Sequence, residues 1–159
     1  MTTENILTTA EISAIREIYR HFPQKSAACI EGLKIIQRQR RWVSDEAIRG
    51  LAEILEMSPA AIDSVATYYS LIFRRPVGRN VILLCNSVSC WIMGCDQIAA
   101  CVKKQLAVDY GETTTDDRYT LLTIPCLGTC DHAPAMIINE DLHRDLTAEN
   151  IGPILQQYQ

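Results

Sequence analysis

The sequence predicts a small helical bundle followed by a domain of the α/β or α+β class. Up to about Phe73, apolar residues recur every three or four positions, which is the spacing of one helix face. A segment rich in turn formers follows at 74–80, and beyond it short apolar runs alternate with helical stretches. We therefore expect a flexible tail at 1–10, a helical bundle at 11–75 and a mixed domain at 80–159.

Each helix of the bundle is expected to begin at a residue type that caps helix N-termini. Thr8 is followed three positions later by Glu11, which is the capping-box pattern. Ser58 precedes Pro59, and proline is favoured in the first turn of a helix. The four expected N-caps are Thr8, Ser26, Ser44 and Ser58. Four short helices with brief connections are typical of a small bundle.

The second half predicts strands and helices in the order β-α-β-β-α. The apolar run at 81–84 is typical of a buried strand, and 119–124 and 135–138 are the other candidate strands. Residues 96–106 carry apolar positions at helical spacing, and Thr147 can cap a last helix. This order favours a sheet covered by helices.

The composition excludes several classes of protein. The 159 residues carry a formal net charge of −4, whereas nucleic-acid-binding proteins usually present a basic face. No apolar run approaches the roughly 20 residues that span a bilayer. The first seven residues lack the positive charge and the apolar run of a secretory signal. We expect a cytoplasmic chain that neither binds nucleic acid nor inserts into a membrane.

Seven cysteines are the main chemical feature of the sequence. An odd number in a reducing compartment does not indicate a disulfide framework, and clustered cysteines there favour metal or redox chemistry. Six of the seven lie in the second half: Cys85, Cys90, Cys95, Cys101, Cys126 and Cys130.

Four of these cysteines form two pairs, Cys85-x4-Cys90 and Cys126-x3-Cys130, each at the end of an expected strand. Two adjacent strands can bring four thiolates to one point, where they can hold a [2Fe–2S] cluster or a zinc ion. Structural zinc more often uses Cys-x2-Cys pairs, which this sequence lacks, and the wider spacing suits the larger cluster. The missing Cys-x-x-Cys also disfavours a thiol oxidoreductase. The spacing alone leaves cluster, zinc and thiol chemistry open.

The other cysteines compete for the ligand role to different degrees. Cys95 lies five residues after Cys90 and is an alternative ligand, although a non-ligand role is favoured. Cys101 and Cys29 lie on apolar faces of expected helices, where a free cysteine behaves as a small buried apolar side chain. Gly128 stands between the cysteines of the second pair, where the backbone must approach the sulfurs closely.

Several further segments carry a resemblance to a known family. They are Leu33–Gln37 with Trp42-Val43, Val65–Ser70 with Phe73, Pro76–Gly78, and Cys126–Asp131 with Ala133-Pro134. Together with the first cysteine pair they make the chain, over about 26–158, similar to the E subunits of respiratory NADH:quinone oxidoreductase (complex I). These subunits are thioredoxin-like [2Fe–2S] ferredoxins. The resemblance implies a helical bundle at 11–75 and a thioredoxin-like [2Fe–2S] domain at 80–159.

The resemblance also implies ligands, a cofactor and partners. In this family the four matching cysteines, Cys85, Cys90, Cys126 and Cys130, ligate one [2Fe–2S] cluster. Such a cluster carries one electron at a time whereas NADH gives up two, and the sequence lacks the G-x-G-x-x-G fingerprint of a dinucleotide site. FMN and NADH are therefore expected on the partner F subunit. The chain would act as one peripheral-arm subunit of the oxidoreductase, on the cytoplasmic side of the inner membrane.

The sequence departs from the family pattern at a few positions. Arg41 stands where the family usually has Gly, and Cys95 is an additional thiol near the cluster loop. Trp91 replaces a frequent His, and His132 replaces a frequent Lys or Arg. Pro134 is expected as a cis-proline or as an ordinary trans turn proline. The alternatives that remain are the equivalent subunit of an NAD-linked hydrogenase or formate dehydrogenase and, from another class, a zinc-stabilised interaction module.

Overall fold

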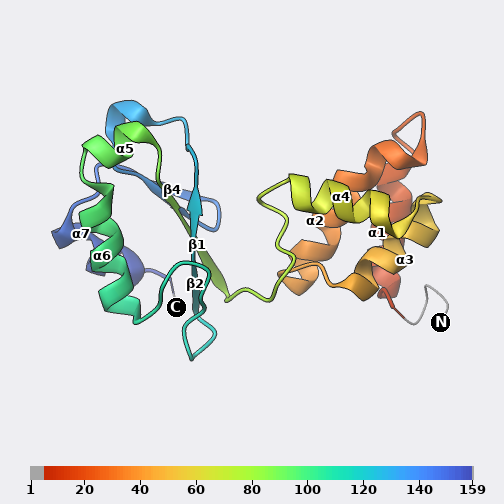
Figure 1. Ribbon diagram of the computed structural model, residues 1–159. Coiled ribbons are helices and arrows are strands. Elements are labelled where there is room, and N and C mark those ends of the chain that lie inside the picture. Colours follow the sequence, from red (N-terminus) through yellow and green to blue (C-terminus); the bar gives the residue numbers. More distant parts are fainter. Residues whose placement is uncertain (1–5, 159) are drawn as a thin grey trace. The chain divides into compact units, whose positions relative to one another are not determined.

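The computed structural model describes residues 6–158, and the chain divides into two compact units at Pro76 and Val77 (Figure 1). Of the expected tail at 1–10, residues 1–5 lie outside the described residues. Leu7 is buried, and the first helix already begins at Thr9. Ordered structure therefore starts before residue 10, because the capping box and a buried leucine fix the chain there.

The first unit contains four α-helices and a short 3₁₀ turn. They are α1 (Thr9–Tyr19), η2 (Lys25–Ala28), α2 (Cys29–Arg40), α3 (Asp45–Leu55) and α4 (Pro59–Tyr68). The capping box of α1 is confirmed, because Glu11 N donates to Thr8 Oγ1 and Thr8 N donates to Glu11 Oε2. Ser44 and Ser58 also cap their helices as expected, each accepting a backbone N–H three residues on.

The second expected cap is wrong. Ser26 lies inside η2, and α2 begins at Cys29 with no side-chain cap at Ala28. The 3₁₀ turn η2 leads directly into α2 and takes the place of a capping side chain at its N-terminus. The helix ends at Arg40, and the C-cap residue Arg41 has the left-handed conformation with φ 71°. This conformation suits glycine best, so a side chain at this position is under some strain.

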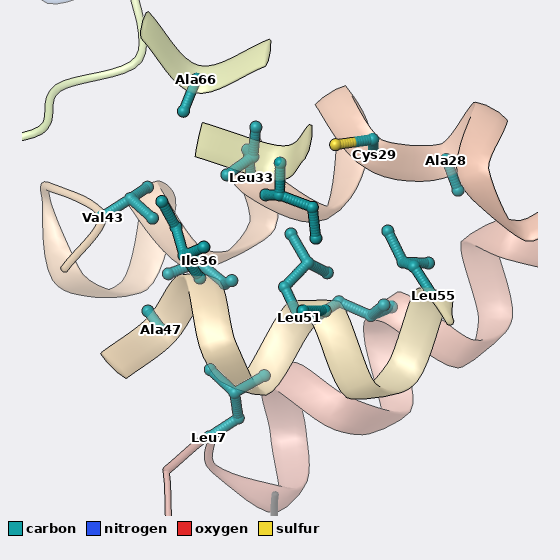
Figure 2. Packing of buried hydrophobic residues seen from close by; sticks show 14 of the residues in the cluster. Leu7, Ala28, Cys29, Leu33, Ile36, Val43, Ala47, Leu51, Leu55 and Ala66 are labelled. Atoms are coloured by element: carbon teal, nitrogen blue, oxygen red, sulfur yellow. The ribbon is translucent and has the colours of Figure 1, made fainter. Parts of the chain in front are cut away.

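The core of the first unit is formed by side chains from all four helices (Figure 2). Leu33, Ile36 and Leu51 are fully buried in it. Cys29 lies in the same core, which confirms its interpretation as an apolar side chain rather than a ligand. At one edge, the completely buried Glu11 carboxylate receives two hydrogen bonds of 2.6 Å from Arg40.

Arg74, which begins the segment rich in turn formers, belongs to the first unit. Its guanidinium contacts Asp45 at 2.6 Å and Asp63 at 3.0 Å, and it donates to the carbonyl of Val43. The end of the helical unit is therefore tied back to α3 and α4 before the chain continues into the second unit.

The second unit is a four-stranded sheet with helices α6 and α7 against one face (Figure 1). Its elements are β1 (Asn80–Cys85), α5 (Val88–Ile92), α6 (Cys95–Leu106), β2 (Tyr119–Ile124), η3 (Cys130–His132), β3 (Met136–Ile138), β4 (Asp141–His143) and α7 (Ala148–Leu155). The strand order is β2-β1-β3-β4, with β1 and β2 parallel and the other pairs antiparallel. This confirms the mixed fold class.

The core of this unit lies between the sheet and the two helices. Ile82 and Leu84 alternate along β1 toward this core, where they meet Val102 of α6 and Ile151 of α7. The short helix α5 and the short edge strand β4 are additional to the expected order. No helix of the described residues is long and apolar enough to cross a membrane.

Candidate metal centre

The parallel pairing of β1 and β2 brings the two cysteine pairs to one edge of the sheet. Cys85 is the last residue of β1 and lies in register with Ile124, the last residue of β2. The pairing continues one step further, because Asn86 N donates to the carbonyl of Ile124 at 3.0 Å. Cys126 follows shortly after β2. Parallel strands end at the same edge, so the sulfurs of both pairs gather there.

All four expected ligand residues line one small hollow. Its walls are Cys85, Cys90, Cys126, Leu127, Gly128, Thr129, Cys130 and Ala135. Cys95 is not one of the lining residues. The structure thus brings together the four cysteines singled out from the sequence and leaves the fifth outside the hollow.

The two cysteine pairs differ in their exposure. Cys85 and Cys90 are each only 2% exposed, and their thiols are hydrogen-bonded to each other. Cys126 and Cys130 are both exposed, and their sulfurs lie 3.9 Å apart. The hollow therefore has a buried inner pair and an exposed outer pair.

Within the buried pair, Cys90 holds its proton firmly when no metal is bound. Burial, together with the hydrogen bond to Cys85, raises the pKa of Cys90 to about 11. Burial also raises the pKa of Cys95, helped by the charges of Asp96 and Cys85. Metal binding requires thiolates, so occupation of this site would release protons.

Backbone groups approach the sulfurs of both pairs. Gly128 has φ 75°, which favours glycine, and its N–H donates to Cys126 Sγ at 3.3 Å. On the inner side, a backbone hydrogen bond from Ala135 lowers the pKa of Cys90 and partly offsets burial. Such N–H donors stabilise thiolates. Sequence reasoning identified Gly128 but not Ala135, because an alanine before a strand carries no recognisable pattern.

The bond between Ala133 and Pro134 is cis, which settles the conformation left open by the sequence. It directly precedes Ala135, whose carbonyl accepts a hydrogen bond from Cys85 N at 3.1 Å. The cis-proline segment therefore lies next to the inner cysteine pair.

The remaining candidates lie outside the hollow. Cys95 is the first residue of α6 and is buried with Cys85, Cys90 and Ala133 in one apolar cluster. Cys101 is half-buried, and its sulfur lies 3.8 Å from the carbonyl of Ala148.

His132 contacts acidic side chains and is not one of the residues that line the hollow. Its Nδ1 lies 3.0 Å from Asp145 Oδ2, and its Nε2 lies 3.5 Å from Asp131. His132 therefore holds the loop after Cys130 to the segment before α7.

Within residues 6–158, no group of three or more His, Cys, Asp or Glu side chains is arranged to hold a single metal ion. The four sulfurs around the hollow are arranged as two pairs.

The short helix α5 was not expected from the sequence, and it positions Cys90. Trp91 N donates to the carbonyl of Ser87 at 2.9 Å, which begins the helix directly after β1. Cys90 is buried, while Trp91 and Ile92 are 60% and 70% exposed. A helix of five residues is too short for apolar periodicity to reveal.

The chain is similar to a known family and to curated relatives. Residues 15–159 match the family model described as thioredoxin-like [2Fe–2S] ferredoxin. The E subunits of NADH-quinone oxidoreductase from Buchnera aphidicola subsp. Acyrthosiphon pisum and Escherichia coli (strain K12) are each 47% identical over 152 residues. These matches cover 96% of this chain and 94% and 92% of the relatives. The protein of the same name from Pseudomonas aeruginosa is 42% identical over 153 residues.

A solved structure shares the fold. The crystal structure of an NAD⁺-reducing [NiFe]-hydrogenase in its air-oxidized state contains a chain that superposes with a TM-score of 0.71 at 23% sequence identity. The match covers 83% of this chain and 23% of the hydrogenase chain. At this identity the likeness establishes the fold alone.

Proposed function

The chain belongs to the thioredoxin-like [2Fe–2S] ferredoxin family, among the E subunits of NADH-quinone oxidoreductase, and we propose that its four lining cysteines hold one [2Fe–2S] cluster. The ligands would be Cys85, Cys90, Cys126 and Cys130. The observation that carries this proposal is their convergence on one hollow from two adjacent parallel strands.

The residues present fit this group. Four thiols are the usual ligand set of a [2Fe–2S] cluster, and no competing histidine or carboxylate lines the hollow among the residues that the structure describes. The sulfurs form an inner pair and an outer pair, which suits a cluster in which each of two irons takes two protein ligands. Gly128 N–H and the backbone of Ala135 would each offset the negative charge of one pair.

The chain's own contribution is to position and shield this site. When bound, a [2Fe–2S] cluster takes up and releases one electron at a time. The inner pair is sealed from water by Ala133 and the apolar cluster around it, whereas the outer pair faces the surface. We propose that single electrons cross at the outer side.

The electrons would be exchanged with FMN on a partner subunit. The relatives are named as subunits of an NADH-quinone oxidoreductase, and NADH gives up two electrons as a hydride. A flavin can accept a hydride and release single electrons, so it can connect NADH with a one-electron carrier. We propose that the NADH-binding F subunit carries this flavin, and that the assembly is peripheral to the inner membrane on its cytoplasmic side.

The deciding experiment measures iron, acid-labile sulfide and zinc in anaerobically purified full-length chain, with an EPR spectrum after reduction. About two irons and two sulfides per chain, with a rhombic EPR signal on reduction, are expected. Zinc without sulfide would overturn the proposal and indicate a structural module. Co-purification separates complex I from related enzymes, because only the former should bring peripheral-arm and membrane-arm subunits of a quinone oxidoreductase.

A further inference from the structure

The two outer cysteines are close enough to react with each other while no cluster is bound. Cys126 and Cys130 are both exposed, and their sulfurs lie 3.9 Å apart. A disulfide has an S–S distance of about 2.05 Å, so the two sulfurs would have to approach by roughly 2 Å. Rotation of two exposed side chains supplies a movement of this size. The bond can therefore form within one loop, without a rearrangement of the sheet.

The backbone of the loop keeps these two sulfurs together. Gly128 lies between them with φ 75°, and its N–H donates to Cys126 Sγ at 3.3 Å. Beyond the glycine, His132 N donates to the carbonyl of Thr129 at 3.1 Å, which closes the 3₁₀ turn that contains Cys130. The closeness of the two sulfurs thus follows from the loop itself and needs no metal.

The other five cysteines are less accessible. The side chains of Cys29, Cys85, Cys90 and Cys95 are 4%, 2%, 2% and 4% exposed, and Cys101 is half-buried. Formation of a disulfide requires that the oxidant reach a sulfur. A bulky oxidant such as glutathione disulfide should therefore react with the outer pair before it reacts with the buried thiols.

We propose that Cys126 and Cys130 form a reversible disulfide in the cluster-free chain, and that this bond prevents a cluster from being loaded. The second part rests on the proposed function, because these two residues are half of the ligand set assigned there. Thiolates are the species that bind metals, and a sulfur held in a disulfide is no longer a thiolate. The outer pair therefore makes cluster loading depend on the redox state of its surroundings.

The oxidant is the disulfide of a small thiol, and the reaction runs in two exchange steps. Cys126 Sγ attacks one sulfur of glutathione disulfide, which forms a mixed disulfide and releases one glutathione. Cys130 Sγ then attacks Cys126 Sγ, which forms the bond within the loop and releases the second glutathione. The two cysteines together lose two electrons and two protons, and glutathione disulfide takes them up as two thiols.

A dithiol reductant reverses both steps. Exposed disulfides are generally more easily reduced than buried structural ones. Reduction would return Cys126 and Cys130 to thiols, while Cys85 and Cys90 stay reduced throughout because they are buried. All four ligands would then be available again.

The test uses the full-length, cluster-free chain, prepared anaerobically with its seven cysteines reduced. Glutathione disulfide is added and then removed, and mass spectrometry with peptide mapping locates any new bond. A scaffold protein loaded with [2Fe–2S] serves as the cluster donor, because free sulfide or thiols would themselves reduce a disulfide. The chain is then separated from the donor, and its iron, sulfide and EPR signal are measured. A second sample of the oxidised chain receives dithiothreitol before the cluster donor.

The oxidised chain should lose the mass of two hydrogen atoms, with the new bond between Cys126 and Cys130. It should take up less than about a tenth of the iron of the reduced chain, because two of four ligands are blocked. Dithiothreitol should restore uptake. Cys101→Ser should behave like the wild type, whereas Cys126→Ala should form no bond within the loop and retain a glutathione on Cys130.

Three results would overturn the proposal. They are a bond that joins other cysteines, a chain that carries glutathione without closing the loop, and an oxidised chain that loads a cluster as well as the reduced one. Failure of the proposed function has a different signature, since the reduced chain itself would then take up no iron or sulfide. In that case the gating of cluster loading would be refuted together with the proposed function.

Discussion

The sulfur of Cys126 lies 3.9 Å from the sulfur of Cys130, at the exposed side of the hollow. These two cysteines come from the loop after β2, whereas the inner pair comes from β1 and α5. Each pair therefore depends on a different segment, and the site is complete only when the two parallel strands are in register. Removing the sulfur of one cysteine should therefore leave the other cysteine of its pair unable to complete the set of four ligands.

Cys126→Ser should lose the cluster or alter it markedly, because serine retains the shape of cysteine but is a poor ligand for iron. Cys101→Ser is the control, since Cys101 lies on α6 against the carbonyl of Ala148 and outside the hollow. Iron, sulfide and the EPR signal after reduction are compared with the wild type. Equal cluster content in the two variants would refute the ligand assignment.

Much of this fold could be predicted because its elements carry local patterns. The capping residues Thr8, Ser44 and Ser58 lie where the helices begin, and the strand at 119–124 has the expected bounds. These predictions depend on hydrogen bonds and periodicity within a few residues. The convergence of the cysteines followed from a single further step, namely that two strands ending in cysteine pairs are adjacent and parallel.

The elements that could not be predicted depend on tertiary context. Ser26 has a capping side chain, but a 3₁₀ turn replaces the cap. Helix α5 has too few residues for periodicity, and β4 is only three residues long, with side chains that are largely outside the core. Arg74 lies in the segment rich in turn formers at 74–80, yet Asp45 and Asp63 bind it. The pairing of such charges is not visible in a linear pattern.

Gly78→Ala should destabilise the protein by about 3 kcal/mol, at the upper end of the range for overpacking. A Cβ at this position would lie 2.9 Å from the carbonyl carbon of Tyr119, which belongs to backbone held by the sheet. The new methyl group would also strain the hydrogen bond of 2.7 Å from Gly78 N to Thr120 Oγ1. Urea unfolding measures the loss.

Gly111→Ala is the comparison for this prediction. Gly111 has φ 85°, and a Cβ at this position would meet open space, so only the left-handed conformation is penalised, at about 1–2 kcal/mol. If Gly78→Ala were no less stable than Gly111→Ala, the backbone at Tyr119 would have to shift easily to make room for the methyl group. That result would contradict the prediction.

Arg40→Met should destabilise the helical unit by about 3 kcal/mol, because it leaves the buried Glu11 carboxylate without its partner. The double variant Arg40→Met with Glu11→Gln removes the unpaired carboxylate charge as well. It should recover part of the lost stability, since glutamine can also complete a capping box. Lys34→Met is the control. It removes an exposed pair with Glu31 and should cost less than about 1 kcal/mol.

The effect of Arg40→Met should depend on pH. Burial raises the pKa of Glu11, but hydrogen bonds from Arg40 and Thr8 outweigh it and lower the pKa below its usual 4.5. A carboxyl with a lowered pKa stabilises the fold above about pH 4.5 and loses this contribution as the pH falls. The difference between wild type and Arg40→Met in urea unfolding should therefore shrink at acidic pH. A constant difference from about pH 7 to about pH 3 would contradict the assigned role of Glu11.

His143 should make the stability of the second unit depend on pH near neutrality. Its Nε2 lies 2.7 Å from the hydroxyl of Tyr158, which in turn donates to Asp141. Burial lowers the pKa of His143 below 6.5, and the charge of Asp141 only partly opposes this. Below pH 6.5 the unfolded chain therefore binds the proton more readily than the folded one, so stability falls as the pH falls through this range.

His143→Gln removes this titration and should flatten the stability curve between about pH 7.5 and about pH 5.5, measured by urea unfolding of the full chain. Glutamine can still donate to the Tyr158 oxygen, so the variant should remain folded at neutral pH. His21→Gln, at an exposed position beyond the end of α1, should keep the wild-type pH dependence. If His143→Gln also retained it, the proton uptake would have to come from another group, and the contact between His143 and Tyr158 would not govern stability in this range.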